Sequence, residues 1–493
     1  MESSQSLILV TGATGYIGGQ LVPKLIEAGH RVRILVRDTK RLRGAPWLPQ
    51  VEVYEGDVLK ADTLAPALKS VNTAYYLVHS LGSGRDFEEQ DILAPRTFST
   101  TAKAEGVKRI VYLGGLGDPD SELSPHLRSR HTTGQALRDS GVPVIEFRAG
   151  VIVGSGSASF EIVRYLTERL PVMICPRWVY TRAQPISIKD IMNYLVGALE
   201  IRLEGSQVVE VGGADILSYG EMMLVYARLR GLRRWIIPVP VLTPHLSSYW
   251  VHRVTPIQAS IAKPLIEGLR NEVIVKNPSA KKLFPTIKPT GYVAAIKSIV
   301  QDLEAGRVKD LWVGFSANDD SRGSVIKSSI KEGVISQRWS RKVPASADAT
   351  FQVISEFGGE HGYYYANWAW RLRGLADRLL GGVGNRLRSP QKTVLEQGDP
   401  LGFWCVDVIE PGRLLRLKAE MKIPGSAWLQ FLVRPISDHS AIVYQTVAFA
   451  PKGISGLVYW YALYPAHAVI FRGLFTAITA LAEDRYSSPT NVK

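Results

Sequence analysis

The stretch LILVTGATGYIGGQL, residues 7–21, decides the fold of the N-terminal half of the chain. A short apolar run, predicted to be a strand, leads directly into Gly12-x-x-Gly15-x-x-Gly18, and a helical pattern follows. In such a turn the first glycine permits a tight bend, the second lets the backbone approach a pyrophosphate, and the third lets helix and strand pack closely. Amides at the start of the helix then face the anion. Strand, turn and helix together predict dinucleotide binding, and an accidental glycine-rich turn is the alternative.

The pattern of the first 310 residues extends this prediction. Apolar runs of strand length alternate with helical stretches, and the later runs read RVRILVR, TAYYLVH, RIVYLGG and PVIEFRA. Such alternation is typical of βαβ units. We therefore expect an α/β N-terminal domain, a doubly wound parallel sheet with helices on both faces.

The alternation of predicted strands and helices no longer holds after about residue 336. Residues 402–435 and 440–451 resemble consecutive antiparallel strands joined by turns such as EPGR and IPGS. We expect helix and loop first, then these strands, then a closing helix, which is an α+β arrangement. The polar, Gly/Ser-rich residues 314–335 are predicted to be a linker, which gives domains at 1–313 and 336–493.

Composition excludes several classes of protein. Hydrophobic residues make up 46% and charged residues 21% of the 493, which is ordinary for globular domains. The net charge is +14, but the basic residues are spread along the chain, so we expect no nucleic-acid partner; anionic small molecules or a membrane surface remain open. Cys175 and Cys405 lack metal-ligand spacing, and no metal site is expected. The N-terminus is unlike a secretory signal, so a cytoplasmic location is expected.

One segment, residues 456–482, is apolar and long enough to span a bilayer. It contains Pro465, His467 and Arg472, and a charge in the middle of a lone span is costly. A buried amphipathic helix is the favoured interpretation, with membrane association as the alternative.

The end of the second strand bears on the choice of dinucleotide. An acidic residue there holds a ribose 2′-hydroxyl, whereas arginine accommodates a 2′-phosphate. Here Arg37 precedes Asp38, and Lys40 and Arg41 follow, so NADP(H) is favoured and NAD(H) stays possible. Asp57, after the third strand, is placed to accept from an adenine amino group or only to cap the next helix.

Motifs across residues 5–305 identify a family. TGATGYIGG, LVR, GDV, YLGGLG and SGVPVIEFRAG together resemble the atypical short-chain dehydrogenases/reductases with an NmrA-like Rossmann domain. The resemblance implies NAD(P) binding by a set of residues in the first four strand ends, namely Gly12, Thr14, Gly15, Tyr16, Ile17, Gly18, Arg37, Asp57, Val58, Leu77 and His79. His79 is equally open to being a loop residue bonded to nearby backbone.

The C-terminal motifs GYYYANWAWRLRGLADRLLGGVG, AEMKIPGSAWLQF and YWYALYPAH resemble an uncharacterised domain often fused behind such reductases. That domain is similar to the SRPBCC (START-like, helix-grip) cavity fold. Its aromatic residues either line a cavity for an apolar molecule or form an ordinary core. Arg371, Arg373, Asp377 and Arg378 are expected to form an ion-paired surface face.

The resemblance also exposes a difference at the catalytic positions. Family members carry a serine at the end of the fifth strand and a Tyr-x-x-x-Lys pair on the next helix. Here Gly114 and Gly115 occupy the serine position, His126 the tyrosine position and Arg130 the lysine position. His126 is a candidate acid because an ordinary histidine titrates near neutral pH. Arg130 is a candidate contact for the nicotinamide ribose, and both residues are alternatively explained by local hydrogen bonds.

Two functions follow from these patterns. The first is an NAD(P)H-dependent oxidoreductase that reduces an apolar, quinone-like or conjugated acceptor, a reaction that depends on positioning more than on a proton donor. The second is a non-catalytic NAD(P)H-binding redox sensor or assembly factor. Fold alone does not choose between them.

Overall fold

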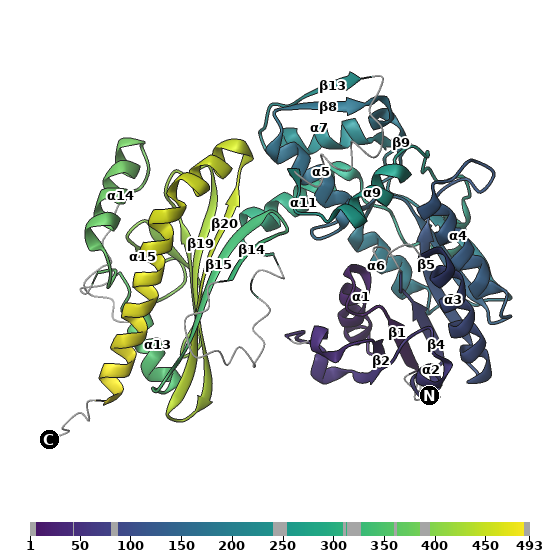
Figure 1. Ribbon diagram of the computed structural model, residues 1–493, viewed down its shortest axis with the longest axis horizontal. Helices are drawn as coiled ribbons and strands as arrows, with labels where there is room; N and C mark the ends of the chain where they lie inside the picture. The colour runs from purple at the N-terminus through teal and green to yellow at the C-terminus, as the bar shows by residue number, and fades with distance from the viewer. Residues whose placement is uncertain are drawn as a thin grey trace. The chain divides into compact units, whose positions relative to one another are not determined.

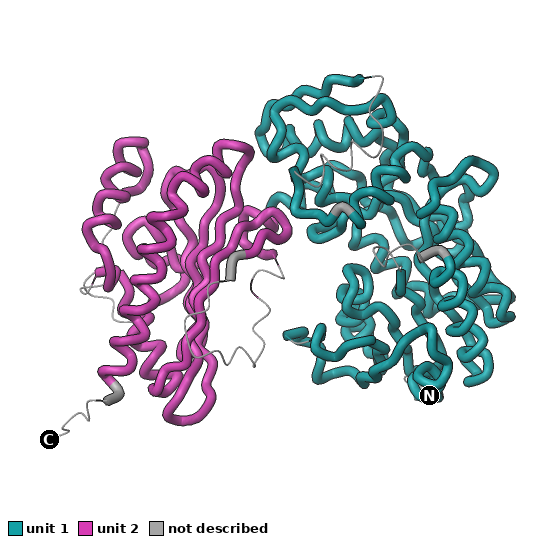
Figure 2. Tube along the Cα trace, viewed as in Figure 1, with its two compact units in different colours: residues 1–301 teal, residues 302–493 magenta. Residues whose placement is uncertain are grey.

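The structure is a computed structural model that describes residues 6–42, 44–79, 87–239, 254–308, 312, 327–358, 362–384 and 395–487. The chain divides into two compact units, Met1–Gln301 and Asp302–Lys493 (Figure 2). Each unit has its own sheet and its own hydrophobic core, so the two are described separately.

Unit 1 is built on a parallel seven-stranded sheet with the order β11-β6-β5-β4-β1-β2-β3 (Figure 1). Its strands are β1 (Leu7–Thr11), β2 (Arg31–Val36), β3 (Glu52–Glu55), β4 (Thr73–Tyr76), β5 (Arg109–Gly115), β6 (Val144–Ala149) and β11 (Gln207–Val211). All neighbouring pairs are parallel. The prediction of a doubly wound parallel sheet is confirmed. The strand order reverses between β1 and β4, which is where ligands bind in sheets of this kind.

Helices cover both faces of this sheet. They are α1 (Tyr16–Glu27), α2 (Ala61–Leu68), α3 (Phe87–Ala104), α4 (Pro125–Arg138), α6 (Ile188–Gly197) and α10 (Ser279–Leu283). Because side chains alternate along a strand, Ile8 and Val10 pack with α1 and α6, whereas Leu9 packs with α2 and α3 on the opposite face. The fully buried, apolar β1 is therefore covered on both sides, as a central parallel strand requires.

A smaller group of elements stands beyond the carboxyl ends of the strands. It consists of β7 (Ile152–Val153), α5 (Ala158–Arg169), β8 (Val172–Pro176), β9 (Arg182–Ala183), β10 (Ile186–Ser187), β12 (Leu217–Ser218), α7 (Tyr219–Leu229), β13 (Trp235–Val239), α9 (Ala259–Gly268) and α11 (Tyr292–Glu304). Three short 3-10 helices, η1 (Thr39–Leu42), η2 (Leu48–Gln50) and η3 (Arg177–Tyr180), complete the unit. A separate core that includes Phe160, Met222 and Tyr226 holds the group together.

Unit 2 is an antiparallel seven-stranded sheet with the order β14-β15-β20-β19-β18-β17-β16. Its strands are β14 (Lys327–Lys331), β15 (Val334–Val343), β16 (Pro400–Leu401), β17 (Trp404–Glu410), β18 (Leu414–Ala419), β19 (Gly425–Ser437) and β20 (Ser440–Pro451). The strands predicted within 402–451 are present and antiparallel, which confirms that part of the prediction.

The expected start of unit 2 was wrong. Residues 314–335 were predicted to be a linker and the chain from 336 to begin as helix and loop, but residues 334–343 form β15, which pairs with β14 on one side and β20 on the other. The strand lacks the apolar alternation that would predict it, because two of its positions are polar. Gln337 is buried within it, and Arg341 donates a hydrogen bond to Thr479 of helix α15. The predicted linker likewise differs: residues 313–326 lie outside the described part of the chain, and β14 begins at Lys327.

The described residues of unit 2 form three further elements beside this sheet, the helices α13 (Ala347–Ser355), α14 (Asn367–Leu379) and α15 (Gly453–Ser487). The apolar segment at 456–482 lies inside α15, whose length and hydropathy would also suit a membrane span. Its C-terminal half contributes Phe471, Leu474, Phe475 and Ile478 to the core of unit 2. One face of α15 is thus a core face of this unit.

Candidate functional site

The site begins at the turn between β1 and α1. Gly12 has φ +73°, and a Cβ there would lie 2.6 Å from the carbonyl oxygen of Leu77. The amide of Gly15 donates to the Gly12 carbonyl at 2.9 Å, and a Cβ on Gly18 would collide with that same carbonyl. Close backbone approach therefore requires glycine at 12 and 18, whereas a Cβ on Gly15 would lie 3.2 Å from the Gly12 carbonyl oxygen.

The mouth of the turn is open to an anion. Gly15 is the N-cap residue of α1 and makes no side-chain capping bond, and the first turn of the helix contains no acidic residue. Thr14 and Gly15 are exposed. The backbone amides at the start of α1 and the positive end of the helix dipole thus lie at an exposed turn, which fits the pyrophosphate of a dinucleotide.

Thr11 ties the turn to the neighbouring strand β4. Its hydroxyl donates to the Tyr75 carbonyl at 3.0 Å and accepts from the Leu77 amide at 3.2 Å. This clasp fixes Leu77 against Gly12. The chain then continues to His79, which places that side chain at the crevice beside the glycine turn.

His79 and His126 meet in this crevice, although 47 residues separate them in sequence. His79 Nε2 and His126 Nδ1 are 3.3 Å apart, and the ring centroids are 5.0 Å apart. Asp91, on α3, lies on the other side of His79, with its Oδ2 3.5 Å from His79 Nδ1. The carboxylate also accepts from Ser129 Oγ at 2.6 Å. A carboxylate and two imidazoles therefore form a chain, Asp91–His79–His126.

Burial sets the protonation of this chain. Burial and the nearby Arg130 lower the pKa of His79, and the Asp91 carboxylate partly opposes that change. Burial, followed by the charges of His79 and Arg130, lowers the pKa of His126 to about 3. Both imidazoles are therefore neutral at pH 7, with His79 Nδ1–H directed at Asp91 and His126 Nδ1–H at His79 Nε2. His126 does not carry the proton of a neutral-pH acid, in contrast to the expectation from its ordinary pKa.

The backbone of α4 positions His126 and Arg130. Ser124 caps the helix by accepting from the Leu127 amide, and Thr133 Oγ1 donates to the Asp91 carbonyl at 3.0 Å. The Arg130 guanidinium donates to the Leu113 carbonyl and lies 5.2 Å from the ring centre of Tyr112. Arg130 is thus directed at β5, and its contact with a nicotinamide ribose stays a prediction.

A larger residue at the end of β5 would require neighbouring side chains to shift. A Cβ on Gly115 would lie 2.8 Å from Leu127 Cδ2, and one on Gly114 would lie 3.1 Å from a ring carbon of Tyr112. His131 Nε2 is 3.1 Å from the Gly115 carbonyl. Helix α4 therefore packs directly on the strand end where the resemblance places a serine.

The predicted adenosine contacts lie at the ends of β2 and β3. Arg37 is exposed there, and Asp38 Oδ1 accepts from the Lys40 amide at 2.9 Å. Asp57 Oδ1 accepts from the Leu59 amide at 3.0 Å, and Val58 is buried. Asp57 thus closes a local turn before α2 and does not cap that helix, whose N-cap residue is Lys60. Its role toward adenine stays a prediction.

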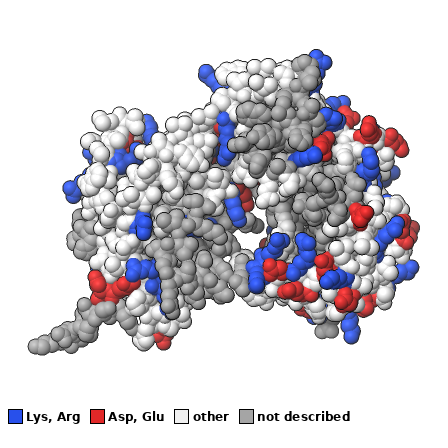
Figure 3. Space-filling view, in the orientation of Figure 1, with Lys and Arg blue, Asp and Glu red and all other residues white. Residues whose placement is uncertain are grey.

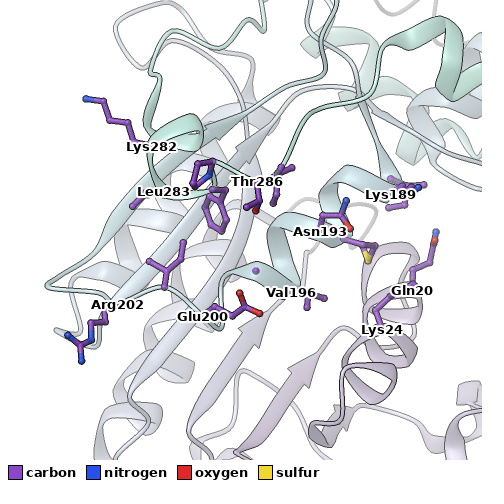
Figure 4. Close-up of a pocket in the computed structure, with 17 residues that line it drawn as sticks. Gln20, Lys24, Lys189, Asn193, Val196, Glu200, Arg202, Lys282, Leu283 and Thr286 are labelled. Atoms are coloured by element: carbon purple, nitrogen blue, oxygen red, sulfur yellow. The ribbon is translucent and has the colours of Figure 1, made fainter.

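A cavity of about 980 Å³ lies elsewhere in unit 1, between α1, α6 and the segment after α10 (Figure 4). Gln20 and Lys24 of α1 face Asn193 of α6 across it, and Leu283 and Thr286 close another side. None of the predicted cofactor or catalytic residues lines it. Among the described residues, no cluster of three or more His, Cys, Asp or Glu side chains is arranged to hold a metal ion.

Sequence reasoning missed Asp91. It lies in residues 79–91, which follow β4 at the site but contain no recognisable motif. Only the packing of α3 against α4 brings the Asp91 carboxylate to His79. A carboxylate one helical turn into the helix after β4 was the one available signal.

Comparison with known families agrees with this geometry. Residues 4–167 match the NmrA-like family, and residues 331–474 match DUF2867, a protein family of unknown function. The match to the NmrA-like family thus falls within unit 1, whose sheet is of the Rossmann type, and the match to DUF2867 falls within unit 2.

Characterised relatives cover about half of the chain. A photosystem II assembly factor, Ycf39, of Cyanophora paradoxa is 23% identical over 48% of this chain and 72% of its own length. A (4-alkanoyl-5-oxo-2,5-dihydrofuran-3-yl)methyl phosphate reductase of Streptomyces griseus is 29% identical over 46% of this chain and 74% of its own. These relatives thus include both an assembly factor and a reductase.

Among solved structures, the triphenylmethane reductase of Citrobacter sp. has a TM-score of 0.49 and 18% identity, covering 60% of this chain and 99% of that one. A structure of the same reductase complexed with NADP(H) has a TM-score of 0.48.

Proposed function

We propose that this protein is an NADP(H)-dependent oxidoreductase that reduces an apolar, quinone-like or conjugated acceptor without a Ser-Tyr-Lys set. The observation that carries the proposal is the open glycine turn at the switch point of the sheet, with the neutral His79–His126 pair beside it. An anion cradle and a relay of imidazoles at one strand edge are a ligand-binding arrangement and serve no evident purpose in stabilising the fold.

The preference for NADP(H) over NAD(H) rests on the end of β2. Arg37, Lys40 and Arg41 are exposed and supply positive charge for a 2′-phosphate. One oxygen of Asp38 is engaged by the Lys40 amide, so this carboxylate is less available for a ribose hydroxyl. NAD(H) remains the second choice.

A bound reduced nicotinamide would supply a hydride, that is, two electrons and one hydrogen nucleus. An acceptor such as a quinone then needs one proton to complete its reduction. Because neutral His126 has its proton on Nδ1, its Nε2 accepts a hydrogen bond from a water molecule beside the acceptor, and the proton is taken from that water. A positioned acceptor gains most of its rate from orientation, so the lack of a strong acid is tolerable in this reaction.

The chain Asp91–His79–His126 has a positioning role in this proposal. Asp91 holds the Nδ1 tautomer of His79, and His79 in turn accepts from His126 Nδ1. The outward Nε2 of His126 is then left as an acceptor. Arg130 acts on the same helix by fixing α4 to the Leu113 carbonyl.

Unit 2 is proposed to be of the helix-grip, SRPBCC-like type and to hold the apolar acceptor. The long helix α15 across an antiparallel sheet supports this proposal. Trp339 Nε1, Trp404 Nε1 and Gln445 Oε1 are buried on that unit's core residues without a hydrogen-bond partner in the structure, which is compatible with a polar group of a guest molecule.

The second candidate is an NAD(P)H-binding protein without turnover, a redox sensor or assembly factor. The low pKa of His126 favours it, since the site then lacks a group that donates a proton at neutral pH. Both candidates require cofactor binding, and only turnover separates them.

The test is to incubate the purified chain with NADPH and a panel of quinones and to follow the absorbance of the reduced nicotinamide. We expect oxidation with at least one quinone. Gly15→Asp should weaken NADPH binding by roughly tenfold or more, because a carboxylate at this N-cap repels the phosphates across a few ångströms. His126→Ala should have only a modest effect on the rate.

Gly205→Asp is the matched control. A Cβ there meets nothing within 4 Å, so the same charge is added to unit 1 away from the turn. Its NADPH affinity should equal that of the wild type. Tight NADPH binding with no oxidation by any quinone would support the sensor instead, and no binding of either nucleotide would refute both candidates.

A further inference from the structure

Helix α14 of unit 2 exposes an apolar face. Trp368, Leu372, Leu375 and Leu379 follow one another at spacings of four, three and four residues, so they lie on one side of the helix. Their exposed fractions are 72%, 58%, 56% and 80%, and the next residue, Leu380, is 63% exposed. Single exposed apolar residues are common, but a continuous stripe of this kind marks an interaction surface.

The charges on this helix are of one sign at the surface. Arg371 and Arg378 are exposed beside the stripe. The one carboxylate of α14, Asp377, is fully buried and accepts from the amides of Gly384, at 2.9 Å, and Lys422, at 2.7 Å. The expected ion-paired surface face is therefore wrong: Asp377 anchors the helix from inside, and arginine alone remains outside. In Figure 3 the region of α14, at the upper left, is mostly white with basic side chains at its edge.

The opposite face of α14 packs on unit 2, so the helix is held in place with its apolar stripe exposed to solvent. Trp370 is 5% exposed and stacks on Tyr363 with ring centres 5.0 Å apart. Arg373 donates to the Tyr459 hydroxyl of α15 at 3.0 Å. The helix can thus keep its position while its outer face changes environment.

The first half of α15, joined to α14 by that bond, adds further exposed apolar side chains. Val458 is 61% and Tyr461 is 54% exposed. They flank Trp460, which is 2% exposed and belongs to the core of unit 2. The apolar surface of unit 2 is therefore wider than one helix.

We infer that α14 docks unit 2 onto an anionic lipid bilayer. Tryptophan and leucine side chains would enter the boundary between headgroups and acyl chains, and Arg371 and Arg378 would pair with lipid phosphates. Charge complementarity selects this occupant, because the charged side chains that α14 exposes are Arg371 and Arg378 and the chain carries a net charge of +14. This inference does not depend on the proposed reaction.

The experiment is co-sedimentation of the full chain with vesicles of phosphatidylcholine containing about 30% phosphatidylglycerol. We expect binding that falls at least fivefold when the anionic lipid is omitted or when salt is raised. Leu375→Glu should lower the bound fraction at least fivefold, because it places a repelled charge in the apolar face. Arg371→Gln with Arg378→Gln should weaken binding while leaving circular dichroism unchanged.

Leu93→Glu is the matched control, since Leu93 is 57% exposed on helix α3 of unit 1. It should bind vesicles as the wild type does. No sedimentation of the wild type, or equal sedimentation of Leu375→Glu, would overturn the inference. So would a dimer in analytical ultracentrifugation that Leu375→Glu dissociates, since the stripe would then bind a second copy of the chain.

Discussion

His126 shows how one substitution changes the chemistry open to a Rossmann site. The resemblance places it where a phenol is expected, and its ordinary pKa suggested an acid. Its surroundings decide otherwise, because burial and two neighbouring basic groups lower the pKa to about 3. The side chain is then an acceptor and a link to His79, and proton donation passes to solvent.

The low pKa predicts a pH dependence of stability. The unfolded chain binds a proton on His126 near pH 6.5, whereas the folded chain binds it only near pH 3. Stability from this group is therefore fully present above pH 6.5 and is lost as the pH falls from 6.5 toward 3, by up to about 1.4 kcal/mol per pH unit. When the pH is lowered from 7.5 to 5, the melting temperature of the His126→Gln variant should fall by fewer degrees than that of the wild type.

The control for this measurement is His439→Gln, a change at an exposed histidine of unit 2. Its melting curve should follow the wild type at each pH. If His126→Gln and the wild type lose the same number of degrees on acidification, His126 is not buried in a neutral form.

At the scale of elements, the contact between β1 and α1 depends on a single missing methyl group. A Cβ on Gly18 would collide with the backbone of Gly12, whereas a Cβ on Gly19 would lie 3.4 Å from the Ala13 carbonyl, an ordinary contact. Gly18 is thus required by packing, whereas an alanine at Gly19 would change only the helix propensity.

Gly18→Ala is predicted to destabilise unit 1 by about 1–3 kcal/mol, because overpacking forces the helix away from the strand. It should also weaken NADPH binding, since the amides at the start of α1 move with the helix. Gly19→Ala should be neutral or stabilising by up to about 1 kcal/mol, since alanine favours a helix. Chemical denaturation and a fluorescence titration with NADPH measure both effects, and equal behaviour of the two variants would contradict this account.

Strand β15 illustrates where local pattern fails at this scale. Its inward positions include Gln337 and Arg341, which break the apolar alternation that marks a half-buried strand. Arg341 is satisfied by Thr479 and Glu483 of α15. Those partners are about 140 residues away, so no window of sequence around β15 contains the reason for its polarity.

For the whole molecule, the main feature is the presence of two separate cores. Unit 1 is organised around a parallel sheet and unit 2 around an antiparallel one, and the cofactor turn belongs wholly to unit 1. A ligand that binds one unit stabilises that unit by mass action.

We therefore predict that NADPH at about 100 times its Kd stabilises unit 1 by about 2.7 kcal/mol and leaves unit 2 unchanged. In calorimetry, one transition should move to higher temperature and one should stay. Unit 1 contains Trp47, Trp178, Trp235 and Trp250, so these four are replaced by phenylalanine for the measurement. Emission from the tryptophans buried in unit 2, such as Trp339 and Trp404, then assigns the stationary transition. A shift of the emission transition by NADPH would contradict the prediction.

The sequence by itself determined the features that depend on short spacings: the strand, glycine turn and helix at residues 7–27, the parallel alternation, and the late antiparallel strands. Each of these features is specified by residues that are close in sequence, because turn geometry and side-chain periodicity are local properties. Only the tertiary structure decided that Asp91, His79 and His126 meet, that β15 joins the sheet, and that the leucines of α14 face outward. These three features depend on which strands pair and which helix faces are covered. Both are specified by contacts between residues that are far apart in sequence.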